Sequence, residues 1–254
     1  MQNIKLMITY DGTNFLGWQK TKMGPSIEGT LETVLEKILQ HPVVLQAASR
    51  TDAGVHANGQ VVNFLSDKSD LSPEKLKFSL NCLLPKDIVV LSTEHVPNDF
   101  HPTLDCINKE YHYSLCHGRI QLPNRRLYSW HYPHTLNIED MREAIQQLIG
   151  ERDFTSFCNV RKDVTYADHM RNLQSIEIVE EAGDYLCFKL TGTNFLYKMV
   201  RNLVGTLVYI SCGKISVGNL RSIIDGRDRT LAGITAPAHG LFLHNVQFRA
   251  TPFG

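Results

Sequence analysis

The sequence predicts an α+β protein with two βαββαβ-like halves, residues 1–104 and 105–254, each holding a mainly antiparallel sheet. Alternating apolar residues typical of half-buried strands recur along the chain, and apolar faces with helical period lie between them. Both halves also show a similar order of elements, which is that of ferredoxin-like and RRM-like units. No internal sequence repeat accompanies this order, so the expected duplication depends on element order alone.

In the first half, apolar residues alternate from Ile4 to Tyr10 and predict a strand. Ser26 is a suitable N-cap for a first helix, because its side chain can accept a hydrogen bond from a backbone N–H in the first turn. Ser72-Pro73 begins a second helix, since the backbone angle of proline suits the first helical position. The other strands expected in this half span residues 43–48, 60–65 and 88–96.

The second half begins with a strand over residues 107–116, which carries Tyr111 and Tyr113 on one face. The turn Ala182-Gly183-Asp184 is typical of a hairpin, so the runs on either side of it should pair. The other expected elements of this half are helices over 138–149, 196–210 and 217–224, hairpin strands over 173–179 and 185–190, and a last strand over 241–248.

The composition is that of an ordinary globular protein of 254 residues, with 43% hydrophobic and 20% charged residues. It excludes a disordered chain, a collagen-like repeat and a disulfide-dense mini-protein. Twenty-six basic residues offset 26 acidic ones, which excludes a uniformly basic nucleic-acid-binding surface. A local basic cleft remains compatible with this balance, because net charge does not describe how charge is distributed.

Three features predict a soluble cytoplasmic protein. The six cysteines include no Cys-x-x-Cys pair, which is typical of reduced thiols. The first residues lack the basic and apolar regions of a signal peptide. The longest stretch without Asp, Glu, Lys or Arg, residues 230–248, contains too many polar residues to span a membrane.

The segment from Ser49 to His56 is the most informative place for chemistry. Asp52 follows a predicted strand and precedes Ala53-Gly54, where glycine permits a tight turn that projects the carboxylate from the end of the sheet. Arg50 adds a positive charge nearby. The local pattern leaves two interpretations equally open, because Asp52 could be a catalytic carboxylate or could cap the amides of its own loop.

The run Arg50-Thr51-Asp52-Ala53-Gly54-Val55-His56, followed by Gly59-Gln60-Val61-Val62, resembles the signature of the tRNA pseudouridine synthase A family. Further blocks resemble the family in the same order and cover nearly the whole chain. They are Tyr10-Asp11-Gly12 with Phe15 and Gly17-Trp18-Gln19, Asn81-Cys82-Leu83-Leu84-Pro85 with Asp87-Ile88, Asp99-Phe100-His101, Lys109-Glu110-Tyr111-His112-Tyr113, Gly150 with Asp153-Phe154-Thr155-Ser156-Phe157, Phe195 to Gly205, Asp228-Arg229-Thr230 to Pro237, and Gly240-Leu241.

The resemblance implies an isomerase that converts uridine to pseudouridine at positions 38, 39 and/or 40 of the tRNA anticodon stem-loop. It implies an active site in a central cleft flanked by the two halves, tRNA as the partner, and a homodimer. No metal and no redox cofactor are needed for this chemistry. The target base must leave its stack to reach a catalytic carboxylate.

The resemblance also implies roles for four residues. Asp52 is the nucleophile, or it stabilises the charge that develops on the sugar. Tyr111 stacks on the base and helps to move the C5 proton; without the resemblance, a cross-strand aromatic contact with Tyr113 is the simpler interpretation. Arg201 pairs with the catalytic carboxylate and favours its charged form. Arg50 occupies the place of the flipped base.

The sequence departs from the family pattern at Ser49, at Pro102-Thr103 and at Glu110, which puts RNA affinity and tRNA range in question rather than the reaction. Two other function classes stay open. The first is an RRM-like protein that holds RNA through aromatic residues without chemistry, in which Asp52 would be dispensable. The second is a metal-dependent hydrolase using Asp52 and His56, which the absence of a third ligand at metal spacing disfavours.

Overall fold

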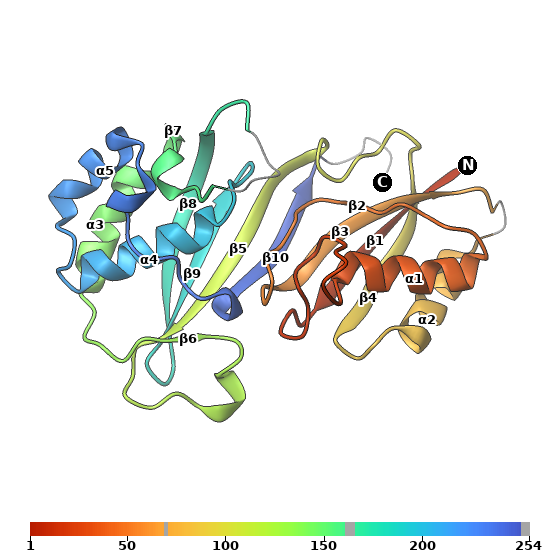
Figure 1. Cartoon of the computed structure of the whole chain (residues 1–254), viewed down its shortest axis with the longest axis horizontal. Coiled ribbons are helices and arrows are strands. Elements are labelled where there is room, and N and C mark those ends of the chain that lie inside the picture. The colour runs from red at the N-terminus through yellow and green to blue at the C-terminus, as the bar shows by residue number, and fades with distance from the viewer. Residues whose placement is uncertain (69–70, 161–165, 250–254) are drawn as a thin grey trace. The chain divides into compact units, whose positions relative to one another are not determined.

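A computed structural model of the chain describes residues 1–68, 71–160 and 166–249 (Figure 1). The chain divides into two compact units, residues 1–107 together with those from Phe242 onward, and residues 108–241. This division groups the last strand with the first unit, whereas the sequence-based boundary between residues 104 and 105 placed it in the second half. As domain limits, 1–104 and 105–254 stay a prediction.

The first unit is built around β1 (Gln2–Tyr10), which lies between two antiparallel neighbours, β3 (His56–Ser66) and β4 (Ile88–Val96). The short strand β2 (Gln46–Ala47) pairs antiparallel with β3. At the start of β3, β10 (Leu241–Phe248) pairs with it in parallel. The strand that follows the Asp52 segment is therefore central in its sheet.

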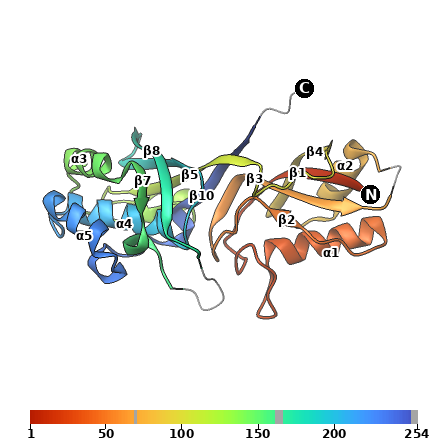
Figure 2. The same cartoon turned by 90° about the horizontal axis from the view of Figure 1, so that it is seen from above.

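Two helices accompany this sheet, α1 (Ile27–Leu39) and α2 (Pro73–Leu83) (Figure 2). The two helices also contact each other. Both predicted N-caps are confirmed, since Ser26 Oγ accepts from the amide of Gly29 and Ser72 Oγ from that of Lys75. The core of the unit consists of apolar side chains from the sheet and both helices, among them Ile4, Leu6, Ile8, Leu31, Leu35, Phe64, Leu76 and Leu80.

The second unit has the strand order β5 (Cys106–Cys116), β9 (Tyr185–Gly192), β8 (Met170–Glu181) and β7 (Gly150–Asp153), with antiparallel pairing throughout that series. The two-residue strand β6 (Trp130–His131) pairs in parallel with the end of β5. The expected hairpin is confirmed as β8 and β9. The α+β class with mainly antiparallel pairing is also confirmed.

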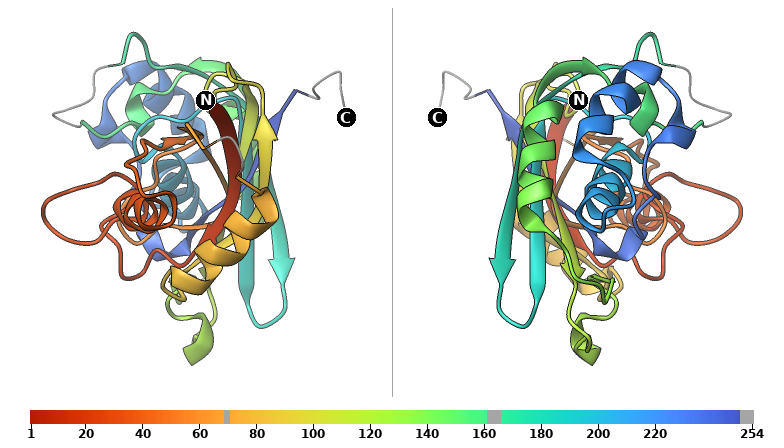
Figure 3. Two further views of the ribbon diagram at one scale, coloured as in Figure 1. Left: turned by 90° about the vertical axis from the view of Figure 1, so that its right-hand side faces the viewer. Right: turned by 90° about the vertical axis from the view of Figure 1, so that its left-hand side faces the viewer.

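Three helices belong to this unit, α3 (Ile138–Leu148), α4 (Met199–Ser211) and α5 (Leu220–Gly226). Figure 3 shows α3 and α4 on the same side of β8 and β9. Nearly every residue of α4 is buried, so this helix is the centre of the unit's core. Single 3₁₀ turns span Pro123–Arg125, Thr155–Phe157, Val217–Asn219, Arg229–Leu231 and Ala238–Gly240.

Several boundaries differ from the sequence-based expectations. The strand expected over 43–48 reduces to β2, and β3 begins at His56 rather than at residue 60. Helix α4 begins at Met199 rather than at residue 196, because Lys198 has a left-handed backbone with φ of 60°. Across the described ranges, none of the helices has both the length and the apolar character needed to cross a membrane.

Candidate active site

Asp52 lies in the loop of residues 49–55 between β2 and β3, called here the Asp52 loop, and its side chain is half-buried. The loop turns tightly, since the amide of Val55 donates to the carbonyl of Asp52 over 3.1 Å. Gly54 has a φ of 76°, a left-handed conformation that few other residues adopt without strain. The turn expected from the Asp-Ala-Gly pattern is present.

A second stretch, residues 10–18, holds the Asp52 loop and is called here the clamp segment. The amide of Trp18 donates to the carbonyl of Thr51 over 3.0 Å, and the amide of Gly54 donates to the carbonyl of Phe15 over 3.4 Å. The hydroxyls of Tyr10 and Thr51 share a buried hydrogen bond of 2.8 Å. These contacts fix the backbone directly before and after Asp52.

Two glycines allow the clamp segment to approach the Asp52 loop this closely. A Cβ atom on Gly12 would lie 2.0 Å from the carbonyl oxygen of Val55, well inside any real contact distance. A Cβ on Gly17 would lie 2.7 Å from the carbonyl oxygen of Thr51. The Tyr10-Asp11-Gly12 and Gly17-Trp18 blocks of the sequence therefore serve to seat the loop that carries Asp52.

His56 is almost fully buried at the start of β3, and its ring stacks on Phe242 with 4.6 Å between ring centroids. Its Nδ1 lies 3.1 Å from both the amide nitrogen of Gly12 and Oδ1 of Asp11. A deprotonated Nδ1 accepts from Gly12, whereas a protonated Nδ1 donates to Asp11. Among the residues that the structure describes, Asp52 and His56 belong to no cluster of three potential metal ligands.

In the second unit, Tyr111 and Tyr113 lie on one buried face of β5. Tyr111 packs edge-on against Phe195, with 5.1 Å between ring centroids. Tyr113 is fully buried and donates its hydroxyl to the carbonyl of Pro237 over 2.9 Å. Burial raises the pKa of Tyr113 well above its usual value, although the charge of Arg201 opposes this shift. Tyr113 therefore stays protonated and anchors the chain near Pro237.

Arg201 lies in the first turn of α4 and is half-buried, on a helix whose other residues are mostly buried. Its Nε donates to the carbonyl of Ala236 over 2.7 Å, and the amide of Ala236 donates to the carbonyl of Arg201 over 3.1 Å. The guanidinium is thus oriented by the segment of residues 233–237. Burial, together with the charge of Arg201, lowers the pKa of His239, which is therefore neutral at pH 7.

The four predicted site residues are divided between the units. Asp52 and Arg50 belong to the first unit, where Arg50 is exposed, and Tyr111 and Arg201 belong to the second. Contact between Asp52 and Arg201 across a central cleft stays a prediction, as do the roles of all four residues.

Sequence reasoning named no role for Tyr10, Gly12, Arg229 or His239, although each lies in or beside a motif block. Asp228-Arg229-Thr230 and Gly240-Leu241 were visible as family-like blocks, and they were the available signal for Arg229 and His239. The contacts of Arg229 depend on the position of the segment of residues 233–237 against α4, which no local pattern of residue types indicates.

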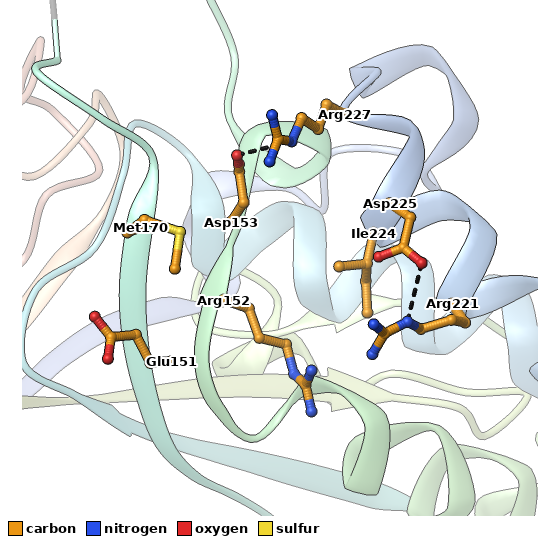
Figure 4. A pocket seen from close by; sticks show the side chains of 8 residues that line it. All are labelled: Glu151, Arg152, Asp153, Met170, Arg221, Ile224, Asp225 and Arg227. Atoms are coloured by element: carbon orange, nitrogen blue, oxygen red, sulfur yellow. Dashed lines mark hydrogen bonds and ion pairs between the residues drawn. The ribbon is translucent and has the colours of Figure 1, made fainter.

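A separate hollow of about 430 Å³ opens in the second unit beside β7 and α5 (Figure 4). Arg227 pairs with Asp153 and Arg221 with Asp225, each over 3.0 Å, so much of its charge is already offset. None of the predicted site residues lines it. The lining residues are Glu151, Arg152, Asp153, Met170, Arg221, Ile224, Asp225 and Arg227.

Comparison with known proteins tests the resemblance. A family model described as tRNA pseudouridine synthase matches residues 6–105 and 144–249. The chain is 54% identical over 248 residues to tRNA pseudouridine synthase A 2 of Protochlamydia amoebophila, covering 98% of this chain and 95% of that protein. It is 38% identical over 248 residues to tRNA pseudouridine synthase A of an Exiguobacterium species, covering 98% of each.

A crystal structure of a Cbf5–Nop10–Gar1 complex is a much more distant match, with 14% identity and a TM-score of 0.39, covering 81% of this chain and 44% of that chain. The full-length matches confirm the resemblance that the motif blocks indicate. The chain belongs to the tRNA pseudouridine synthase family, whose members are isomerases.

Proposed function

We propose that this protein isomerises uridine to pseudouridine at positions 38, 39 and/or 40 of the tRNA anticodon stem-loop. The observation that carries the proposal is the Asp52 loop, which presents a half-buried carboxylate on a turn seated by the clamp segment. Full-length similarity to enzymes named tRNA pseudouridine synthase A supports catalysis over RNA binding alone.

In the proposed reaction, the bond between N1 of the uracil ring and C1′ of the ribose breaks, the base turns, and C5 forms the new bond to C1′. The C5 proton then leaves and N1 gains one, so the product is an isomer of the substrate. The Asp52 carboxylate acts as nucleophile or stabilises the positive charge that develops on the sugar. A clamped loop suits either role, because the carboxylate must be placed before the reaction begins.

The other site residues support this step. Tyr111 stacks on the uracil and helps to remove the C5 proton. Its position on a buried strand face, packed against Phe195, holds its ring in place for this role. Arg201 is proposed to supply the positive charge that pairs with the Asp52 carboxylate. Arg50 fills the space that the flipped nucleotide leaves in the stem-loop, a role to which its exposed position on the Asp52 loop is suited.

The proposed assembly is a cytoplasmic homodimer that binds tRNA and needs no metal or cofactor for the chemistry. A chain with 26 basic and 26 acidic residues has limited basic surface, so two copies could share one tRNA. We expect full activity to be retained after dialysis of the protein against a chelator, measured with tRNA that has been folded with magnesium.

The test uses the purified full chain and a tRNA transcript labelled with tritium at C5 of uridine, because formation of the new bond releases that tritium. Matched transcripts carry cytidine at positions 38, 39 and 40. We expect release only from the uridine transcript, and Asp52→Asn should slow it by at least about a thousandfold while tRNA binding is kept.

The control Asp225→Asn removes an exposed, ion-paired carboxylate and should leave the rate unchanged. Wild-type binding of tRNA without tritium release, or an Asp52→Asn rate within tenfold of wild type, contradicts the proposal and favours the RRM-like alternative.

A further inference from the structure

Arg229 is a partly buried cation in the turn that follows α5, and the proposed mechanism does not use it. Its guanidinium donates four hydrogen bonds: Nη1 to the carbonyl of Gly233 over 2.8 Å, Nη2 to Asn202 Oδ1 and to Thr235 Oγ1, each over 2.9 Å, and Nε to Asn159 Oδ1 over 3.4 Å. None of these four acceptors is a carboxylate, so within the part of the chain that the structure describes the charge is offset by neutral groups.

Burying a charged group costs free energy unless hydrogen bonds or an ion pair compensate for its lost hydration. Burial lowers the pKa of the Arg229 guanidinium, which shows that desolvation acts against the charge. A planar fork of donors can reach several acceptors at fixed angles, which the single ammonium of lysine cannot do. The arrangement therefore indicates that Arg229 fixes the relative positions of the groups that accept its hydrogen bonds.

Asn202 accepts one of these four hydrogen bonds and is the residue next to Arg201 on α4. Its side chain is fully buried, and its Oδ1 accepts from both Arg229 and Thr235, the latter over 2.7 Å. Its Nδ2 donates to the carbonyl of Phe157 and to Asn159 Oδ1. Asn202 thus links Arg229 to the first turn of α4 with every side-chain group satisfied.

The segment of residues 233–237 lies directly against α4. The amide of Gly233 donates to Thr206 Oγ1 over 2.9 Å. A Cβ atom on Gly205 would lie 1.7 Å from the carbonyl oxygen of Ile234, so the two backbones touch at that point. Further along, Ala236 and Arg201 bond to each other through both the backbone and the Arg201 side chain.

We propose that Arg229 is a positioning residue: by holding Gly233 and Thr235 to Asn202, it places the carbonyl of Ala236 and thereby the guanidinium of Arg201. The inference rests on the proposed function, since it gives Arg229 a part in catalysis only if Arg201 has one. Arg229 touches neither substrate nor reacting atoms in this role.

The first measurement needs no substrate. In nitrogen-15 NMR spectra of the full chain, the Nε–H signal of Arg201, assigned by its loss in Arg201→Lys, should be protected from exchange by the bond to Ala236. We expect Arg229→Gln to speed this exchange at least about tenfold, because one hydrogen-bonded anchor of the segment is removed.

A gentler pair of variants covers the case in which Arg229→Gln fails to fold. Thr235→Ser keeps the hydroxyl that bonds Arg229 and Asn202, whereas Thr235→Val removes it at nearly constant volume. Exchange at Arg201 should stay slow in the serine variant and become faster in the valine variant. Equal exchange in both overturns the proposal.

The second measurement is the single-turnover rate of pseudouridine formation alongside the dissociation constant for tRNA. Arg229→Gln and Thr235→Val should lower the rate about tenfold and leave the dissociation constant within twofold, while Thr235→Ser should restore the rate. Arg221→Gln, which removes an exposed arginine paired with Asp225, is the matched control and should behave as wild type.

The two measurements separate this inference from the proposed function. If wild type forms no pseudouridine, the proposed function fails and the NMR exchange alone decides whether Arg229 holds Arg201. If wild type is active and both Asp52→Asn and Arg201→Met slow the reaction, but folded Arg229→Gln keeps the wild-type rate, the proposed function stands and the positioning role is wrong.

Discussion

The Asp52 loop and the segment of residues 233–237 are both irregular stretches that sit against other parts of their own unit, but they are held by different means. The Asp52 loop is held largely by backbone bonds from the clamp segment, such as that from Trp18 to Thr51. The segment of residues 233–237 depends strongly on side chains, above all the guanidinium of Arg229 and the amide of Asn202.

This difference predicts which substitutions each region tolerates. Backbone bonds survive most side-chain changes, so the Asp52 loop is sensitive mainly where an added Cβ has no room, as at Gly12. A side-chain network loses a bond whenever one of its polar groups is removed, and the buried partner is then left unsatisfied. The Asp52 loop should therefore fail mainly when atoms are added, whereas the segment of residues 233–237, which also has no room for a Cβ at Gly205, should fail as well when a polar group is removed.

The largest combined effect on stability and rate is expected in the Asp52 loop for Gly12→Ala. The new methyl group would lie 2.0 Å from the carbonyl oxygen of Val55, so the clamp segment and the loop must separate. We expect the free energy of unfolding to fall by about 2–4 kcal/mol. The single-turnover rate should fall by about a hundredfold or more, because Asp52 moves with the loop.

Urea unfolding and tritium release measure the two effects of Gly12→Ala. Gly24→Ala is the matched control in the same unit, since its Cβ would meet only the flexible side chain of Leu16. Wild-type stability and rate in Gly12→Ala would show that the close approach at Gly12 does not seat the loop.

A smaller effect, confined to catalysis, is expected at Arg201. Arg201→Met removes the charge and the Nε–H that donates to Ala236, and we expect a rate about a hundredfold lower with little change in stability. Arg201→Lys should fall between methionine and wild type, because it keeps the charge but loses the fork. Single-turnover rates with saturating tRNA test this order. Equal rates in all three proteins contradict the proposed pairing with Asp52.

The smallest effect is a pH dependence of stability at His239, two residues beyond the segment of residues 233–237. Burial lowers the pKa of His239 below its usual value of 6.5, with the charge of Arg201 acting in the same sense and a backbone hydrogen bond with Ser129 opposing it. The folded state therefore binds the proton less readily than the unfolded state. The contribution to stability is present above about pH 6.5 and is lost as pH falls through the folded-state pKa.

His239→Asn removes this proton equilibrium. Between pH 7 and pH 5.5, the Tm of wild type should fall about 1–2 °C further than that of His239→Asn, a small difference because His239 is only half-buried. Thermal unfolding by circular dichroism gives both curves. Parallel curves for the two proteins would exclude a neutral, desolvated His239 in the folded state.

Much of the fold could be predicted, because its signals are local. Ser26 and Ser72 cap α1 and α2 as their neighbours in the sequence suggest, and the hairpin of β8 and β9 follows from its turn. The short strands β6 and β7 were missed because two to four residues carry too little periodicity to be recognised. They are strands only because a longer strand lies beside them.

The sequence by itself determined the helix caps, the tight turn at Asp52-Ala53-Gly54 and, through many motif blocks in one order, the family. Only the tertiary structure decided why Gly12 and Gly205 must lack a side chain and which acceptors surround Arg229. Many of those contacts join residues that are 27 or more positions apart, such as Arg229 with Asn202. Such contacts form only when packing brings distant segments together, and no local pattern of residue types specifies them.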